Sequence, residues 1–215
     1  DALKILKKSI DKNFENAVNI ILKCQSKIIL CGVGKSGLIA AKIASTLSSV
    51  GSPAYSLSAN DCLHGDLGSI TKRDVLVLIS NSGKSEEIIP IIKFANRNKI
   101  KLIGIVSKKK SILYKASDIK ILLPEVKESG LGIVPTSSTS IQLAIGDALA
   151  IAALKKRQFS KFDFSRFHPG GNLGKQLKTV GDIMVLGKKI PLMNENKNMK
   201  EALKIITKKK LGVLI

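Results

Sequence analysis

Short hydrophobic runs alternate along the chain with longer segments in which apolar residues recur every three or four positions. An unbroken apolar run is typical of a strand buried on both faces of a sheet, and the longer spacing is typical of an amphipathic helix. The two patterns alternate, which predicts a parallel sheet covered by helices on both faces, as in α/β proteins. The strands are predicted at residues 27–31, 53–57, 75–79, 101–106 and 119–123.

The segments between and around these strands predict the helices. Residues 1–24 have the spacing of one amphipathic helix or of a helix pair, which could pack on its own domain or on another subunit. Residues 162–174 are rich in glycine and proline, so we expect an irregular segment there. Further helices are predicted at residues 38–50, 88–94, 111–116 and 141–154, the last with a close helix contact at Gly146 and a polar partner for Asp147.

The pattern changes from about Val180 onward. An amphipathic helix is predicted at residues 199–207, followed by an apolar strand at residues 211–215. We therefore expect one sizeable α/β domain and the start of a second module.

The net charge of the chain raises the question of a nucleic-acid partner. The formal net charge is +20, with 36 Lys and Arg against 16 Asp and Glu. The basic residues are spread along the chain, however, aromatic residues make up only 4%, and no basic-region, zinc-finger or RNP pattern occurs. We therefore expect a lysine-rich solvated surface that helps to attract an anionic metabolite, and no nucleic-acid partner.

The same inventory bears on membranes, metals and compartment. No apolar run has the length of a membrane span and no signal-peptide pattern occurs, so no membrane association is expected. The three cysteines, Cys24, Cys31 and Cys62, show no CxxC spacing and are expected to be reduced, mostly buried thiols of a cytoplasmic protein. Without a Cys/His cluster, no zinc site is predicted. No cofactor is expected either.

A glycine-rich turn, Gly32-Val33-Gly34-Lys35-Ser36-Gly37, follows the first strand. It has neither the Walker spacing nor the dinucleotide-binding spacing, so the sequence does not support binding of a nucleoside triphosphate. As a surface residue Lys35 would be unremarkable. Beside two glycines at the carboxyl end of a strand, Lys35 and Ser36 are expected to meet an anion or a sugar oxygen.

A hydroxyl-rich turn, Ser80-Asn81-Ser82-Gly83-Lys84-Ser85-Glu86-Glu87, follows the third strand. Hydroxyl and N–H groups at a helix N-terminus favour a bound anion, and Gly83 lets the backbone approach it. The two carboxylates either complement the helix dipole or supply a base for a phosphorylated substrate. The alternative is an ordinary strand–loop–helix junction with good capping residues.

Three other segments carry candidate polar groups. His64 is either part of a site loop or a structural histidine satisfied by Asp66. Glu128 follows the last strand, and the residues from Pro135 to Ser140 have more hydroxyls than one helix cap needs. His168, fixed before a proline, is a candidate acid/base group.

These motifs occur together in a known family. The glycine-rich turn, the hydroxyl-rich turn, His64-Gly65-Asp66-Leu67-Gly68, Pro135-Thr136-Ser137-Ser138-Thr139 and His168-Pro169-Gly170-Gly171 appear in the order found in sugar isomerase (SIS) domains. More narrowly, residues 1–178 resemble the arabinose-5-phosphate isomerases. The resemblance implies a three-layer α/β/α sandwich with a mostly parallel five-stranded sheet. Residues 179–215 resemble a linker and the opening of a CBS domain, through Val180-Gly181-Asp182-Ile183-Met184.

The resemblance implies reversible interconversion of D-ribulose 5-phosphate and D-arabinose 5-phosphate through an enediolate, in the Kdo branch of lipopolysaccharide biosynthesis. It also implies a cytoplasmic homotetramer with sites at subunit interfaces and no required metal. The implied catalytic residues are Lys35, Glu87, Glu128 and His168, and the implied substrate-binding residues are Gly34, Ser36, His64, Ser80, Asn81, Ser82, Ser85, Thr136 and Ser137.

The roles of these residues are hypotheses at this point. We expect Glu128 or Glu87 as the base, Lys35 as the electrostatic stabiliser, and His168 in ring opening or proton transfer, reaching into a neighbouring subunit's site. The alternative is a non-catalytic SIS domain that senses phosphosugars. A sensor would need the phosphate-binding turns but not all four catalytic residues, and residues 1–24 are too short for the helix-turn-helix module that such regulators carry.

Overall fold

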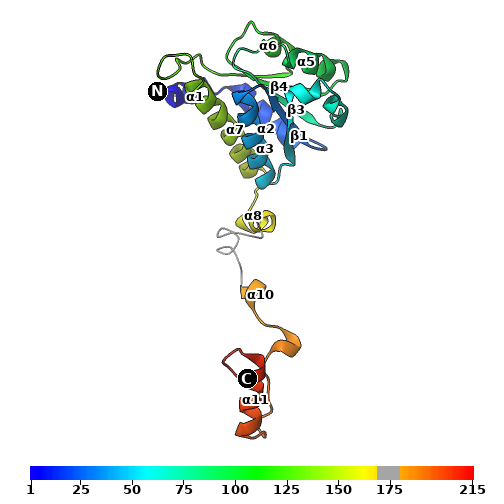
Figure 1. Cartoon of the computed structure of the whole chain (residues 1–215), viewed down its shortest axis with the longest axis vertical. Coiled ribbons are helices and arrows are strands. Elements are labelled where there is room, and N and C mark those ends of the chain that lie inside the picture. Colours follow the sequence, from blue (N-terminus) through cyan, green and yellow to red (C-terminus); the bar gives the residue numbers. More distant parts are fainter. Residues whose placement is uncertain (169–179) are drawn as a thin grey trace. The chain divides into compact units, whose positions relative to one another are not determined.

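The computed structural model describes residues 1–168 and 180–215. The described chain divides into two compact units, Asp1–Phe167 and His168–Ile215, and each is described by itself. The first unit contains the predicted sheet and the helices that cover it (Figure 1). The predicted domain boundary, between residues 178 and 179, lies outside the described residues.

A five-stranded sheet with all neighbours parallel forms the centre of the first unit, in the order β2-β1-β3-β4-β5. Each predicted strand is present, shifted by at most one residue at its ends, so the predicted parallel sheet is confirmed. β1 pairs with β2 on one side and with β3 on the other, which places the topological switch point between β1 and β3. The strands are β1 (Ile28–Gly32), β2 (Ala54–Ser58), β3 (Val75–Ile79), β4 (Lys101–Val106) and β5 (Ile119–Leu122).

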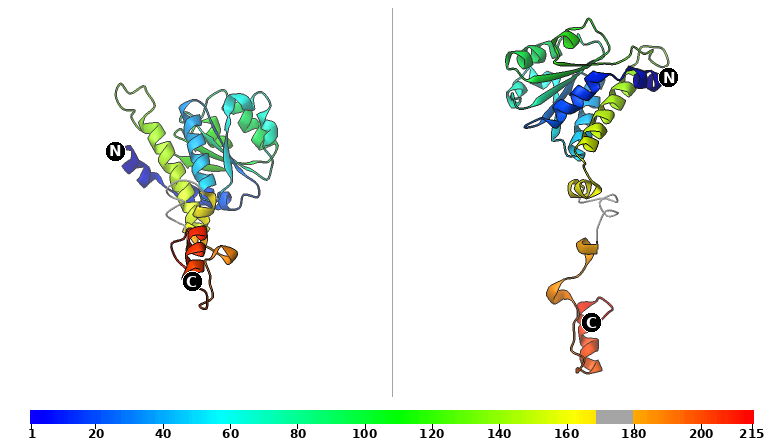
Figure 2. Two further views of the ribbon diagram at one scale, coloured as in Figure 1. Left: turned by 60° about the horizontal axis from the view of Figure 1, so that its bottom comes forward. Right: turned by 180° about the vertical axis from the view of Figure 1, so that it is seen from behind.

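Helices cover both faces of this sheet, which confirms the three-layer sandwich (Figure 2). Successive strand residues point to opposite faces, so Ile28 and Leu30 belong to one core cluster, and Ile29 and Cys31 to the other. The first cluster packs against α1 (Ala2–Ser9), α2 (Lys12–Leu22), α3 (Lys35–Ser49) and α7 (Ser137–Lys156). The second packs against α4 (Ala59–Cys62), α5 (Ile88–Arg97) and α6 (Ile112–Ala116).

The helices α3 and α7 lie side by side, the blue and yellow-green helices of Figure 2. Gly146 of α7 allows this approach, because a Cβ at that position would overlap the end of the Ile43 side chain. Lys42 Nζ forms an ion pair with Asp147 at 2.5 Å across the same contact. Both the predicted close contact at Gly146 and the predicted polar partner of Asp147 are confirmed.

Two helices begin earlier than predicted, α3 at Lys35 and α7 at Ser137. The hydroxyl residues that follow Thr136 therefore form the first turn of α7 instead of a loop before it. The predicted irregular segment is wrong for residues 162–167, which belong to α8 (Lys161–Phe167). The reason is a reciprocal capping pair, in which Ser160 Oγ accepts from Asp163 N at 3.2 Å and Asp163 Oδ2 accepts from Ser160 N at 2.9 Å.

Helix α7 corrects a second expectation. By length and composition it is apolar enough to cross a membrane, so the prediction that no segment reaches this length was wrong. The described part of the chain contains this one such helix, and 44% of its most apolar window is buried against the rest of the protein. Its buried residues, among them Ile141, Ile145 and Leu149, pack in the first core cluster, and a core helix of this kind passes the same test.

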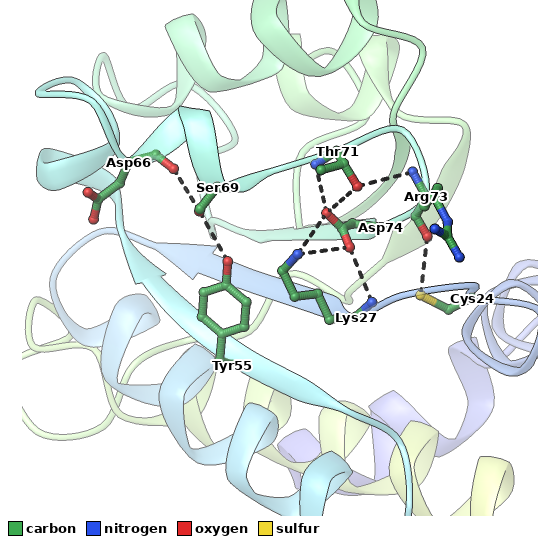
Figure 3. A network of polar contacts seen from close by, with 8 residues as sticks. All are labelled: Cys24, Lys27, Tyr55, Asp66, Ser69, Thr71, Arg73 and Asp74. Atoms are coloured by element: carbon green, nitrogen blue, oxygen red, sulfur yellow. Dashed lines mark hydrogen bonds and ion pairs between the residues drawn. The ribbon is translucent and has the colours of Figure 1, made fainter.

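Asp74, which is 1% exposed, accepts several hydrogen bonds at the amino-terminal ends of the central strands (Figure 3). Its carboxylate accepts from Thr71 N at 2.7 Å, from Thr71 Oγ1 at 2.9 Å, and from the backbone N–H and Nζ of Lys27, each at 3.2 Å. Burial raises the pKa of Asp74, but hydrogen bonds from Thr71, Ser26 and Lys27 outweigh burial and lower it. Because Lys27 precedes β1 and Asp74 precedes β3, this network joins the beginnings of the two central strands. In the same view, the hydroxyls of Tyr55 and Ser69 lie 3.1 Å apart and link β2 to the short helix η1 (Asp66–Ser69).

The second unit contains α10 (Val180–Ile183), the short helix η2 (Gly187–Lys189) and α11 (Met199–Lys209). The predicted helix at residues 199–207 is confirmed as α11, capped by Asn198. The predicted strand at residues 211–215 is wrong, since Gly212 adopts φ +71° and only Ile215 forms backbone hydrogen bonds, with Pro191 and Met193. No CBS segment is evident in residues 180–215.

Candidate functional site

A cavity of about 380 Å³ opens at the carboxyl edge of the sheet. Its walls come from the segments that follow β1, β3 and β5 and from the first turns of α7. Since the carboxyl ends of parallel strands meet at one edge, the β1/β3 switch point places these distant segments together. The lining residues are Val33, Lys35, Ser36, Asn81, Glu128, Ile133, Pro135, Ser138, Thr139 and Gln142.

The glycine-rich turn brings the N-terminus of α3 directly onto the end of β1. A Cβ on Gly32 would lie 2.8 Å from the Ser36 carbonyl oxygen, and Gly34 adopts φ +55°, which favours glycine. Lys35 is the first residue of α3 and is exposed. Ser36 is half-buried and donates its hydroxyl hydrogen to Gln142 Oε1 at 3.2 Å. The turn thus places an ammonium and a hydroxyl on the same side of the cavity.

Glu128 binds the N-terminus of α7. Its Oε2 accepts from Thr136 N at 2.8 Å, from Ser138 N at 3.1 Å and from Thr136 Oγ1 at 3.2 Å. Burial raises the pKa of Glu128, but hydrogen bonds from the hydroxyl and N–H of Ser138 and of Thr136 outweigh it and lower the pKa to about 2. The carboxylate in this cavity is therefore fully ionised near neutral pH and is weakly basic.

The hydroxyl-rich turn is stabilised mainly by its own groups. Ser80 Oγ accepts from Gly83 N at 3.0 Å and lies 3.4 Å from Ser85 Oγ, while Ser82 Oγ accepts from Lys84 N at 3.3 Å. Asn81 Oδ1 accepts from Ser107 Oγ at 2.6 Å, a contact that ties the ends of β3 and β4 together.

This turn lies differently from the prediction. Of its residues, Asn81 lines the cavity, whereas Ser80, Ser82 and Ser85 are not among the lining residues. α5 begins at Ile88, so the seryl groups precede the helix by a further turn. Glu87 occupies the N-cap position of α5, is half-buried, and makes no side-chain capping hydrogen bond.

The other predicted residues are not among the lining residues. His64 is exposed in the turn after α4, where its backbone N–H donates to the Asp61 carbonyl at 2.9 Å. Thr136 is the N-cap residue of α7, and Ser137 is the first residue of that helix. His168 belongs to the second unit, and the Pro-Gly-Gly motif after it lies outside the described residues. Among residues 1–168 and 180–215, no group of three or more His, Cys, Asp or Glu side chains is gathered as a metal ion would require.

Gln142 was missed by the sequence reasoning. It is 1% exposed, yet it lines the cavity. The available signal was a lone amide in the apolar stretch of α7, one turn after Ser138 and therefore on the same helix face. Ser138 and Thr139 were part of a recognised hydroxyl-rich segment but were not named as site residues.

An α/β/α sandwich with a polar cavity at the switch point is typical of α/β domains that bind a small ligand there. Sequence comparison identifies the family of this domain. The family model described as SIS domain matches residues 21–152, and the chain belongs to this family.

Within this family, the chain is similar to several isomerases. The chain is 42% identical over its whole length to the arabinose 5-phosphate isomerase KdsD of Yersinia pestis, and 44% identical over 99% of its length to KdsD of Francisella tularensis. The chain spans 66% of the length of each of these relatives. Among solved structures, c3406 of E. coli CFT073 in complex with arabinose 5-phosphate is similar with a TM-score of 0.73 and 35% identity, over 78% of this chain and 92% of that one.

Proposed function

We propose that this protein is a sugar-phosphate isomerase that interconverts D-ribulose 5-phosphate and D-arabinose 5-phosphate. One observation carries the proposal: the cavity of an SIS-family fold places the ammonium of Lys35, the ionised carboxylate of Glu128 and the hydroxyls of Ser36, Ser138 and Thr139 around one volume. Similarity to arabinose 5-phosphate isomerases supports the choice of this substrate.

The reaction needs these kinds of group. After ring opening of the aldose, a base removes a proton from one carbon of the substrate and the proton returns to its neighbour, with an enediolate between the two steps. A carboxylate suits the base, and an ammonium at the first turn of α3 lowers the free energy of the negative oxygen that forms. Binding energy from the phosphate, which does not react, then serves to orient the reacting carbons.

We assign the phosphate to the hydroxyl-rich turn. Ser82 and Ser85 lie in the turn ahead of α5, where the helix dipole favours an anion, and the buried Ser80 stabilises that turn by accepting from Gly83 N. Gly34 and the Thr136–Ser137 step border the same edge of the sheet. The +20 net charge of the chain supports attraction of a sugar phosphate to this edge.

The two candidate bases differ in their surroundings. Glu128 lines the cavity, but its hydrogen bonds to α7 hold the pKa of the carboxyl at about 2, so it removes a carbon-bound proton inefficiently unless those bonds are released. Glu87 has no such bonds and lies outside the cavity lining. We propose that the ionised Glu128 orients the sugar, and that Glu87 is the base when the ligand lies between the turn after β3 and the segment after β5.

A coupled assay tests the activity. Purified protein is incubated with D-ribulose 5-phosphate and EDTA, and D-arabinose 5-phosphate is followed in Lys35→Met, Glu87→Gln and Glu128→Gln variants. Turnover that falls most in Glu87→Gln supports the proposed base, and full turnover in that variant removes it. Ligand binding without any turnover in the wild type would favour the phosphosugar sensor, which the comparisons do not favour.

Assembly and location complete the proposal. We propose a cytoplasmic homotetramer in which His168 enters a neighbouring subunit's site, with an SIS domain over residues 1–178. Light scattering gives the mass of the assembly. Restored turnover on mixing His168→Ala with Lys35→Met protein would support a shared site, since each variant supplies the group that the other lacks.

A further inference from the structure

Gln142 is a buried amide whose position calls for a function. It lies on α7, 1% exposed, and touches both the cavity and Ser36 of α3. An amide in an apolar helix face loses its hydrogen bonds to water, so its groups need partners in the protein or in a ligand. We propose that Gln142 and Ser36 form a donor–acceptor pair that binds one hydroxyl group of the sugar; this rests on the proposed function.

The direction of one hydrogen bond fixes what Ser36 can do. A serine hydroxyl has one hydrogen to donate and two lone pairs to accept with. The hydrogen of Ser36 is directed to Gln142 Oε1 at 3.2 Å. Toward a ligand, Ser36 Oγ can therefore only accept.

The amide nitrogen supplies the other half of the pair. Within the described residues, Gln142 Nε2 has no hydrogen-bond partner, and it is absent from the fully buried side-chain atoms without one, a group that contains Ser52 Oγ alone. Nε2 thus retains contact with the cavity instead of being sealed in the core. Its N–H groups are available to donate to a ligand oxygen.

A donor beside an acceptor matches a hydroxyl group, which both donates and accepts. It does not match a phosphate dianion, whose oxygens only accept and would meet the lone pairs of Ser36. The pair therefore recognises the polyol end of the ligand and separates it from the phosphate end, which we assign to the turn after β3.

Calorimetry at pH 8 with two probes, arabinose 5-phosphate and inorganic phosphate, tests the proposal. Gln142→Met preserves the length and volume of the side chain but removes both polar groups. We expect arabinose 5-phosphate to bind about ten-fold more weakly, the loss typical of one or two neutral hydrogen bonds, with an affinity for inorganic phosphate unchanged within about two-fold. The KM for the sugar phosphates should rise by a similar factor.

Two further variants keep the test decisive. Ser36→Ala, at a half-buried position, should cause the same selective loss, and the double variant should lose less than the product of the two, because both groups bind one hydroxyl. Ser140→Ala is the matched control, since its exposed hydroxyl is bonded to the Thr136 carbonyl and lies outside the cavity lining. It should leave both affinities unchanged.

Distinct outcomes separate this inference from the proposed function. Equal losses for both probes, or unchanged binding of arabinose 5-phosphate in Gln142→Met, would overturn the pair even in an active isomerase. Selective loss in a protein without turnover would support the pair and reject the isomerase. No binding of arabinose 5-phosphate by the wild type would overturn both.

Discussion

Replacement of Glu128 by glutamine should destabilise the first unit in a pH-dependent way. The carboxylate caps α7 through hydrogen bonds from Thr136 and Ser138, and its pKa falls from the ordinary 4.5 to about 2 in the folded protein. If fully realised, that change would stabilise the ionised folded state by about 3 kcal/mol. The group is partly exposed, so screening by water reduces the expected contribution to about 1–2 kcal/mol, which is also the usual cost of losing a helix cap.

The direction of the pH dependence follows from the lowered pKa. A group with a lowered folded-state pKa adds stability that is complete above its unfolded pKa, 4.5, and is lost as the pH falls toward the folded value, about 2. The difference in unfolding free energy between wild type and Glu128→Gln should therefore be constant from pH 7 to about 5. It should then shrink steadily toward pH 2, because the wild-type carboxyl becomes neutral like the amide.

Urea unfolding followed by circular dichroism, at several pH values between 7 and 2, measures this difference. Using the difference cancels the other carboxyl groups, which titrate in both proteins. Glu125→Gln is the matched control, since Glu125 lies three residues earlier and its one ion pair within the described residues is exposed, with Lys108 at 2.6 Å, and worth about 0–1 kcal/mol. A constant difference down to pH 2, or no difference at pH 7, would refute the capping role of Glu128.

Three further changes test other parts of the structure. Gly146→Ala should cost about 1–3 kcal/mol, because the new methyl group overlaps Ile43, and Ile43→Ala in the same chain should cost less than it does alone; urea unfolding of the double-mutant cycle measures this coupling, and simple additivity would contradict the contact. Asp74→Asn should lower the unfolding free energy by about 2–3 kcal/mol, since an amide accepts fewer of the hydrogen bonds from Thr71 and Lys27. An unchanged urea midpoint would show that the Asp74 network does not stabilise the sheet. Lys35→Met should reduce kcat about 10²–10³-fold with an unchanged melting temperature, because Lys35 is exposed and has no ion pair among the described residues, and unaltered turnover would remove it from the mechanism.

The three central strands of the sheet, β1, β3 and β4, were predictable because they are buried on both faces. Residues 75–79 are all buried and apolar, and an unbroken apolar run does not have the three-to-four-residue spacing of an amphipathic helix. Helix boundaries were less predictable, because they depend on single hydrogen bonds. The cap between Ser160 and Asp163 begins α8 in a segment that composition alone marks as irregular, and Glu128 allows α7 to begin at Ser137.

The candidate site shows the same division. Lys35, Ser36, Asn81 and Glu128 were named from the sequence and line the cavity, because each lies shortly after the carboxyl end of a strand, and parallel strands bring those ends together. Local pattern therefore determined which turns meet. It also located the hydroxyl-rich start of α7.

Only the tertiary structure decided how these groups are used. Ser36 and Gln142 lie 106 residues apart, and their hydrogen bond exists because Gly146 lets α3 and α7 approach closely. The low pKa of Glu128 likewise depends on Thr136 and Ser138, which reach it only when the last loop folds back on α7. Sequence pattern determines where the chain turns, whereas burial and hydrogen-bond direction depend on packing between segments that no local pattern relates.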